Sequence, residues 1–231
     1  TNCYMVQITY EETPRLCCIN RNMRTKYKLP THGELKHINI DLDKLQAATD
    51  KLANDYVDVK TANKMLCDNH MALSKSVYDN FEQVNLTEFG GEKELEYTDS
   101  IKERLRRGEE KLYNKPNEKY IGSYFEEICN QFECDKMRVR ITKLDPHTNV
   151  PMHIDYDPTY ATRVIIPVYT NEKVKNLFKV KGEEIETHLE AGKAYFLNTG
   201  FAHGVFNKSD EPRIAFMFSL DGQNDITDIR L

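Results

Sequence analysis

The sequence predicts a mostly β protein, a double-stranded β-helix of the jelly-roll type preceded by a helical N-terminal half. Two observations predict this class. Beyond residue 136, short apolar runs recur roughly every 8 to 12 residues, separated by turn residues such as Gly182, Gly192 and Gly200. Before that point, apolar residues recur at helical spacing instead. The chain has 231 residues, which suits one large domain with added helices.

The predicted order of regions follows from this change of pattern. Residues 1–135 are expected to form a helical and irregular region that packs on the barrel. Residues 136–222 are expected to form the double-stranded β-helix, and residues 223–231 a C-terminal tail.

Three segments of the first region predict helices. Leu42–Ala48 and Ser100–Leu112 carry apolar residues at helical spacing among many charges. Asn117–Phe132 carries a stripe of aromatic and aliphatic residues on one helical face.

Seven segments of the second region predict strands. Met137–Ile141 alternates apolar and basic residues, and Val164–Tyr169 is an apolar run typical of a buried strand. The others are Leu177–Val180, Glu184–Leu189, Ala194–Leu197, His203–Phe206 and Ile214–Leu220.

Composition narrows the class of function. The 32 basic and 37 acidic residues give a net charge of -5, which argues against the basic face of a nucleic-acid-binding protein. No apolar run approaches the roughly 20 residues that span a membrane, so no membrane partner is expected. None of the six cysteines forms a Cys-x-x-Cys pair, and we expect reduced thiols and a cytoplasmic location.

The most informative motif is His153-Ile154-Asp155, followed fifty residues later by His203. Side chains at i and i+2 of a strand point to the same face, so His153 and Asp155 can converge on one metal ion. His203 follows a glycine turn, and an antiparallel return strand of a jelly roll would bring it to the same place. Two imidazoles and a carboxylate suit Fe(II) with open coordination positions.

Arg213 precedes the last apolar strand and is a single charge beside a buried run. A guanidinium can hold a carboxylate through two parallel hydrogen bonds. Together with the His-x-Asp and His motif, Arg213 therefore predicts a site for a dicarboxylate near the metal.

These motifs carry a resemblance to a known family. From about Met137 to Leu220 the chain resembles the Fe(II)/2-oxoglutarate-dependent dioxygenases, whose double-stranded β-helix is cupin-like. It is most similar to the aspartyl/asparaginyl β-hydroxylase-like branch, which includes cis-proline hydroxylases. The segments that carry the resemblance are Arg140–Leu144, Pro151–Asp155, Thr162–Val168, His203–Asn207 and Arg213.

The resemblance implies an activity and its cofactors. His153, Asp155 and His203 would bind Fe(II) as the catalytic metal, and Arg213 would pair with the distal carboxylate of 2-oxoglutarate. The expected reaction uses O₂ to hydroxylate an amino acid or a peptidyl residue, with succinate and CO₂ as co-products. The expected partner is therefore a small-molecule or peptide substrate.

Two positions depart from the branch pattern. Aspartyl/asparaginyl β-hydroxylases proper have glycine where this chain has Asp155, which the proline hydroxylases share. The strand that commonly reads Arg-x-His has Ile165 in place of the histidine. Arg163 remains, and the resemblance implies that it contacts a substrate or co-substrate carboxylate.

Neighbours of these residues are candidates for supporting roles. Asn198 and Asn207 flank His203; Asn198 is assigned with Arg213 and Arg163 to cofactor binding, whereas Asn207 could equally cap the turn that follows it. Tyr156, Asp157 and Tyr160 are expected on the rim of the pocket, although Asp157-Pro158 is also a turn signal.

Two other classes of function compete with this interpretation. The first is a non-enzymatic jelly-roll binding module, because the same fold serves lectins and capsids. It gives no reason for the three metal ligands to converge. The second is another metalloenzyme on the same barrel, such as an isomerase or a thiol dioxygenase, which usually recruits further His or Glu ligands.

Overall fold

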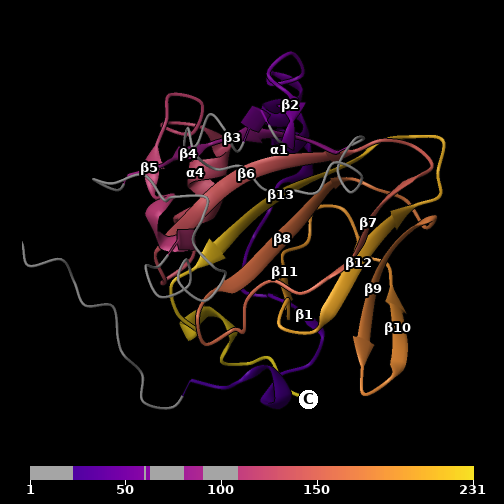
Figure 1. Ribbon diagram of the computed structural model, residues 1–231. Helices are drawn as coiled ribbons and strands as arrows, with labels where there is room; N and C mark the ends of the chain where they lie inside the picture. Colours follow the sequence, from indigo (N-terminus) through magenta and orange to yellow (C-terminus); the bar gives the residue numbers. More distant parts are fainter. Residues whose placement is uncertain (1–22, 60, 63–80, 91–108) are drawn as a thin grey trace, which may run out of the picture.

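A computed structural model describes residues 23–59, 61–62, 81–90 and 109–231. Within them, two antiparallel sheets make up most of the fold (Figure 1). The seven-stranded sheet has the order β1-β11-β8-β13-β6-β3-β2, and the four-stranded sheet has the order β10-β9-β12-β7. The predicted class, mostly β and antiparallel, is therefore confirmed.

The strands of the seven-stranded sheet are β1 (His32–Glu34), β2 (Val57–Asp58), β3 (Phe81–Asn85), β6 (Lys136–Leu144), β8 (Thr162–Tyr169), β11 (Tyr195–Leu197) and β13 (Arg213–Leu220). Those of the four-stranded sheet are β7 (Thr148–His153), β9 (Val174–Val180), β10 (Glu183–Thr187) and β12 (Ala202–Asn207). A small ribbon pairs β4 (Thr87–Glu88) with β5 (Lys115–Pro116). The helical elements are the α-helices α1 (Leu42–Asp50) and α4 (Tyr124–Cys129), with the 3-10 turns η1 (Lys26–Lys28), η2 (Glu109–Leu112) and η3 (Asn224–Ile226).

The seven-stranded sheet has two chemically different faces. Along β13, Phe216 and Phe218 belong to the large apolar core, which also contains Leu45 of α1 and Phe125 of α4. Because side chains alternate across a strand, the residues of β13 that alternate with Phe216 and Phe218 face the four-stranded sheet. Ala215, for example, packs in a second cluster with Phe178 of β9. We call this second side the inner face.

The turn between β9 and β10 lies where the sequence predicts a turn. Lys181 and Gly182 connect β9 to β10 with φ values of 52° and 91°. Two consecutive positive φ values are typical of the tight hairpin turn that matches the strand twist.

The pairing of β6 with β13 contains a bulge. Met217 lies opposite Arg140, but Ser219 lies opposite Met137, so β6 carries one extra residue. Arg138 lies within this bulge and has a φ of 49°, the left-handed region that side chains other than glycine rarely adopt.

The helical N-terminal half is not confirmed in the described residues. The helix predicted over Leu42–Ala48 is present as α1, capped by Asp41, whose side chain accepts from the backbone of Lys44. The stripe over Asn117–Phe132 is helical only from Tyr124 to Cys129.

Two physical causes explain the difference. Ser123 caps α4, and Gly122, with a φ of 71°, turns the chain just before it. Elsewhere, β2 and β3 add strands to the edge of β6, so pairing with the sheet determines their conformation rather than local spacing. Of the helix predicted over Ser100–Leu112, residues 100–108 lie outside the described residues, and Glu109–Leu112 form a 3-10 turn.

The division into residues 1–135, 136–222 and 223–231 stays a prediction. The strands β1, β2 and β3 precede residue 136 and belong to the seven-stranded sheet. None of the helices in the described part of the chain has the length and apolarity needed to cross a membrane.

Candidate active site

His153, Asp155 and His203 meet at one end of the four-stranded sheet. His153 is the last residue of β7, and the antiparallel pairing of β12 with β7 brings His203 directly opposite it. Asp155 follows two residues later, and its backbone donates to the carbonyl of Thr199. One potential ligand atom from each residue lies within 4.8 Å of the other two. The structure thus brings together the three residues that the sequence singled out.

Hydrogen bonds fix the orientation of both imidazoles. His153 Nδ1 lies 2.8 Å from the carbonyl of Pro151, and His203 Nδ1 lies 3.0 Å from that of Phe201. A carbonyl only accepts, so each Nδ1 carries the proton and each Nε2 keeps its lone pair. The Nε2 atoms face Asp155, at 3.7 Å and 3.9 Å from its carboxylate oxygens.

The protonation states also suit metal binding. Burial lowers the pKa of His203 to about 4, so its imidazole is neutral at pH 7. Burial alone would raise the pKa of Asp155, but Arg163 and the two histidines lower it below its usual value. A neutral His203 imidazole and an ionised Asp155 carboxylate can therefore act as ligands of a divalent cation, with His153 as the third.

A buried charge cluster lies behind Asp155. Arg163 Nη2 is 3.4 Å from Asp155 and 3.3 Å from the carboxylate of Glu110. Glu110 is fully buried in η2 and also accepts from Arg138 at 2.9 Å and from the hydroxyl of Ser219 at 2.8 Å. Burial opposes the charge of Glu110, but Arg138, Arg163 and Arg140 lower its pKa to about 2.

Arg213, at the start of β13, is a buried cation outside this charge cluster. Its side chain is 3% exposed and its Nη1 lies 3.4 Å from the hydroxyl of Thr142. Burial lowers its pKa to about 10. In the described part of the chain no carboxylate pairs with it, so a dicarboxylate ligand would supply a missing counter-ion.

The two asparagines that flank His203 in the sequence, Asn198 and Asn207, form hydrogen bonds to backbone carbonyls. The fully buried Asn198 donates through Nδ2 to the carbonyls of Lys26, Leu29 and Pro30, while its Oδ1 has no hydrogen-bond partner among the residues that the structure describes. Asn207 donates to three carbonyls and accepts from Ser209, which is the turn-capping alternative considered above.

The loop after Asp155 shows the turn chemistry that its sequence predicts, whereas its place on the rim of a pocket stays a prediction. Asp157 accepts from Thr159 and from the backbone of Lys26, which is ordinary turn chemistry. The rings of Tyr156 and Tyr160 lie 4.8 Å apart, and the Tyr160 hydroxyl accepts from the backbone of Glu110.

Four residues of this site were not singled out from the sequence: Glu110, Arg138, Arg140 and Ser219. For the two arginines a signal existed, because the alternation in Met137–Ile141 puts both on one face of a strand. Glu110 lies in a charged segment in which no local pattern distinguishes it.

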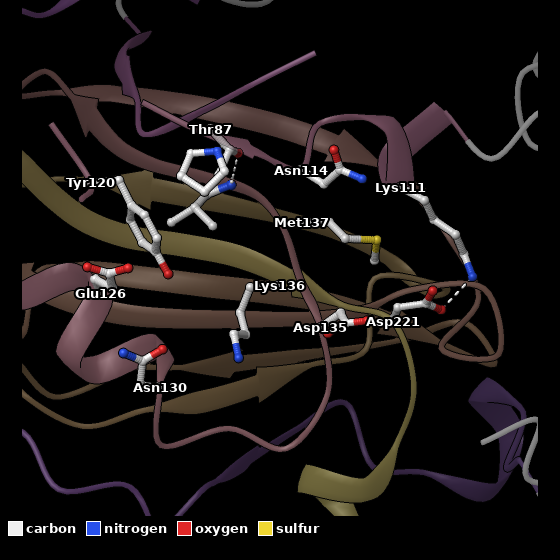
Figure 2. A pocket seen from close by; sticks show the side chains of 12 residues that line it. Thr87, Lys111, Asn114, Tyr120, Glu126, Asn130, Asp135, Lys136, Met137 and Asp221 are labelled. Carbon is white, nitrogen blue, oxygen red and sulfur yellow. Dashed lines mark hydrogen bonds and ion pairs between the residues drawn. The ribbon is translucent and has the colours of Figure 1, made fainter. Parts of the chain in front are cut away.

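A separate cavity of about 490 Å³ lies beside the first residues of β6 (Figure 2). Lys136 and Met137 line it together with Tyr120 and the ion pair of Lys111 with Asp221. None of the three candidate metal ligands lines this cavity, so it is not part of the candidate active site.

Residues 108–221 match the family model of aspartyl/asparaginyl beta-hydroxylase. This match confirms the superfamily resemblance identified in the sequence, and it supports a hydroxylase of the 2-oxoglutarate- and Fe(II)-dependent type in general terms. No curated protein matches the chain.

Solved structures with some likeness include an oxidoreductase of the 2OG-Fe(II) oxygenase family from Burkholderia pseudomallei. It is 13% identical, with a TM-score of 0.43 over 75% of this chain and 76% of that one. A cupin domain from Bordetella pertussis Tohama I is 19% identical, with a TM-score of 0.31 over 39% and 86% of the two chains.

Proposed function

Because residues 108–221 match the aspartyl/asparaginyl beta-hydroxylase family, we propose that this protein is an Fe(II)- and 2-oxoglutarate-dependent dioxygenase. It would hydroxylate an amino acid or a peptidyl residue, with succinate and CO₂ as co-products. The observation that carries the proposal is the convergence of His153, Asp155 and His203, whose ligand atoms lie within 4.8 Å of one another.

The three ligands would hold Fe(II) from one side. Both Nδ1 atoms are engaged by backbone carbonyls, so the Nε2 atoms are pre-oriented for the metal. When bound, Fe(II) would supply open positions at which the keto acid and O₂ react. The chain's own task is to keep the His203 imidazole neutral and the Asp155 carboxylate ionised.

The co-substrate would be held by Arg213. This guanidinium is buried, faces the inner side of the sheet, and pairs with no carboxylate among the described residues. A carboxylate bound there would receive charge-assisted hydrogen bonds in a site largely closed to water. The hydroxyl of Thr142, 3.4 Å from Arg213, would lie beside the same carboxylate.

Arg163 and Asn198 would act at the other end of the co-substrate. Arg163 contacts Asp155 and would set the direction from which this carboxylate approaches the metal. Asn198 would act through the segment Lys26–Pro30, which its amide ties to the turn that precedes His203.

Anaerobic titration tests the proposal. Apo-protein is titrated first with Fe(II) and then with 2-oxoglutarate, with absorbance followed for the weak visible charge-transfer band near ~500 nm expected of a metal-bound keto acid. We expect His153→Ala to abolish the band. Arg213→Met should raise the 2-oxoglutarate concentration needed for half-saturation by roughly 30-fold, the loss of about 2 kcal/mol.

The controls separate the competing functions. Lys143→Met changes a partly exposed charge on β6 that pairs with Glu82, and it should leave the titration unchanged. Failure of the wild type to bind Fe(II) would favour a non-enzymatic binding module. Binding of Fe(II) without any response to 2-oxoglutarate would favour another metalloenzyme on the same barrel.

A further inference from the structure

Arg140 lies on the inner face, in a row of side chains that crosses three strands. In the pairing of β6 with β13, Arg140 is opposite Met217, and in the pairing of β13 with β8, Met217 is opposite Ile165. Ile165 and Met217 pack in the cluster that contains Phe178 of β9, so this row faces the four-stranded sheet. Arg140 is the charged side chain of the row.

Arg140 is buried, and in the part of the chain that the structure describes no carboxylate forms an ion pair with it. It is 8% exposed, and its one hydrogen bond among the described residues runs from Nη1 to the carbonyl of Arg138, at 3.0 Å. Its neighbours differ in this respect, because Arg138 and Arg163 both pair with Glu110. Burial, with repulsion from Arg163 and Arg138, holds the pKa of Arg140 well below its usual range.

The balance of buried charge points to a missing anion. Arg140, Arg163 and Arg213 are buried and supply three positive charges, and Glu110, which pairs with Arg163, supplies one buried negative charge. Arg138 and Asp155 are more exposed and add one charge of each sign, so an excess of two positive charges remains. A divalent metal and the doubly charged co-substrate would cancel each other, so they leave this excess unchanged. An uncompensated buried cation is strongly unfavourable, and a bound carboxylate would relieve it.

We propose that Arg140 binds a carboxylate group of the substrate. The assignment rests on the proposed function, in which Arg213 already accounts for the distal carboxylate of the co-substrate. Ile165, in the same row as Arg140, lies two residues from Arg163, which contacts Asp155, so a carboxylate bound to Arg140 would lie at the metal end of the inner face. The substrate class is therefore a carboxylate-bearing amino acid, free or with its acid group in a side chain.

The test uses pairs of probes that differ in one charge. The twenty free L-amino acids and their α-carboxamides are each added to full-length protein, with and without Fe(II) and 2-oxoglutarate under anaerobic conditions. Binding is measured as a shift in thermal unfolding and, for each probe that shifts it, as a dissociation constant by calorimetry. Asparagine and glutamine serve as the natural side-chain amides of aspartate and glutamate.

Three variants identify the group responsible. Arg140→Met removes the charge at similar size and should weaken binding of the preferred acid on the order of 30-fold. Arg140→Lys keeps the charge but loses the forked geometry, so it should weaken binding less. Lys143→Met lies three residues along the same strand, on the opposite face, and should bind like the wild type.

Each other outcome overturns the inference. If the wild type prefers no acid over its amide, the inner face has no substrate carboxylate site. If Arg140→Met instead weakens the titration with 2-oxoglutarate and leaves the acids unaffected, the carboxylate is that of the co-substrate.

Failure of the proposed function would look different. In that case no visible band would appear with Fe(II) and 2-oxoglutarate in any variant. The preference for acids over amides could still be measured in the metal-free protein, where it would still depend on Arg140.

Discussion

The two faces of the seven-stranded sheet contrast sharply although they share the same strands. The face toward α1 and α4 is apolar, with Phe216 and Phe218 fully buried against Phe125 and Phe132. The inner face carries Arg213 and Ser219 on the same strand. Alternation along one strand thus separates the residues that hold the fold together from those proposed to bind ligands. The comparison predicts that replacing a ring on the apolar face lowers the free energy of unfolding, whereas replacing Arg213 on the inner face leaves it unchanged or raises it.

The largest effect on stability is expected on the apolar face. Phe216→Ala should lower the free energy of unfolding by about 3–5 kcal/mol, because it removes a fully buried ring that lies 5.1 Å from Phe125 and leaves a cavity. Urea unfolding followed by circular dichroism measures this. A loss below about 1 kcal/mol would mean that the face is not the main core.

Glu110→Gln should have the next largest effect. It removes the one carboxylate shared by Arg138 and Arg163, and breaking a buried pair in this way costs about 3 kcal/mol. The same unfolding experiment measures the loss, with Ser219→Ala as a control that removes only a hydroxyl donor to Glu110. Equal losses in the two variants would show that hydrogen bonding, and not charge, holds the cluster.

The charge of Glu110 also predicts how the free energy of unfolding varies with pH. Its pKa is about 2 in the folded protein, against an ordinary value of 4.5. Between these values the unfolded chain binds a proton that the folded protein does not, so stability falls as the pH drops from 4.5 toward 2. The free energy of unfolding, measured from pH 4.5 to pH 2, should fall less steeply in Glu110→Gln than in the wild type. Parallel curves for the two proteins would contradict the lowered pKa of Glu110.

Arg213→Met should have the smallest effect on stability, and with the opposite sign. Arg213 is a buried cation that has no acidic partner among the described residues. Its replacement by an apolar side chain of similar length should leave the free energy of unfolding unchanged or raise it by about 1 kcal/mol. Calorimetric unfolding without ligand measures this. A large loss would mean that Arg213 supports the fold, which would weaken its proposed role in binding 2-oxoglutarate.

Sequence patterns predicted one part of this contrast better than the other. The apolar face was accessible because alternation along the strands marks it, and His153 and Asp155 were accessible through their i, i+2 spacing. His203, fifty residues later, was accessible because it follows a glycine turn and belongs to a segment that resembles the family. The role of Glu110 was not accessible, because its contacts to Arg163 and Ser219 span 53 and 109 residues of sequence. The helical N-terminal half was overestimated because β2 and β3 acquire their conformation from the edge of the sheet.

The bulge at Arg138 has a consequence for how this chain can vary in length. Because β6 carries one extra residue there, everything before it is offset by one position relative to β13. Met137 nevertheless lies opposite Ser219, so deleting Arg138 would remove the bulge and, with it, the cation that pairs with Glu110. Homologous chains should therefore tolerate insertions and deletions in the turn between β9 and β10, while the start of β6 keeps a constant length.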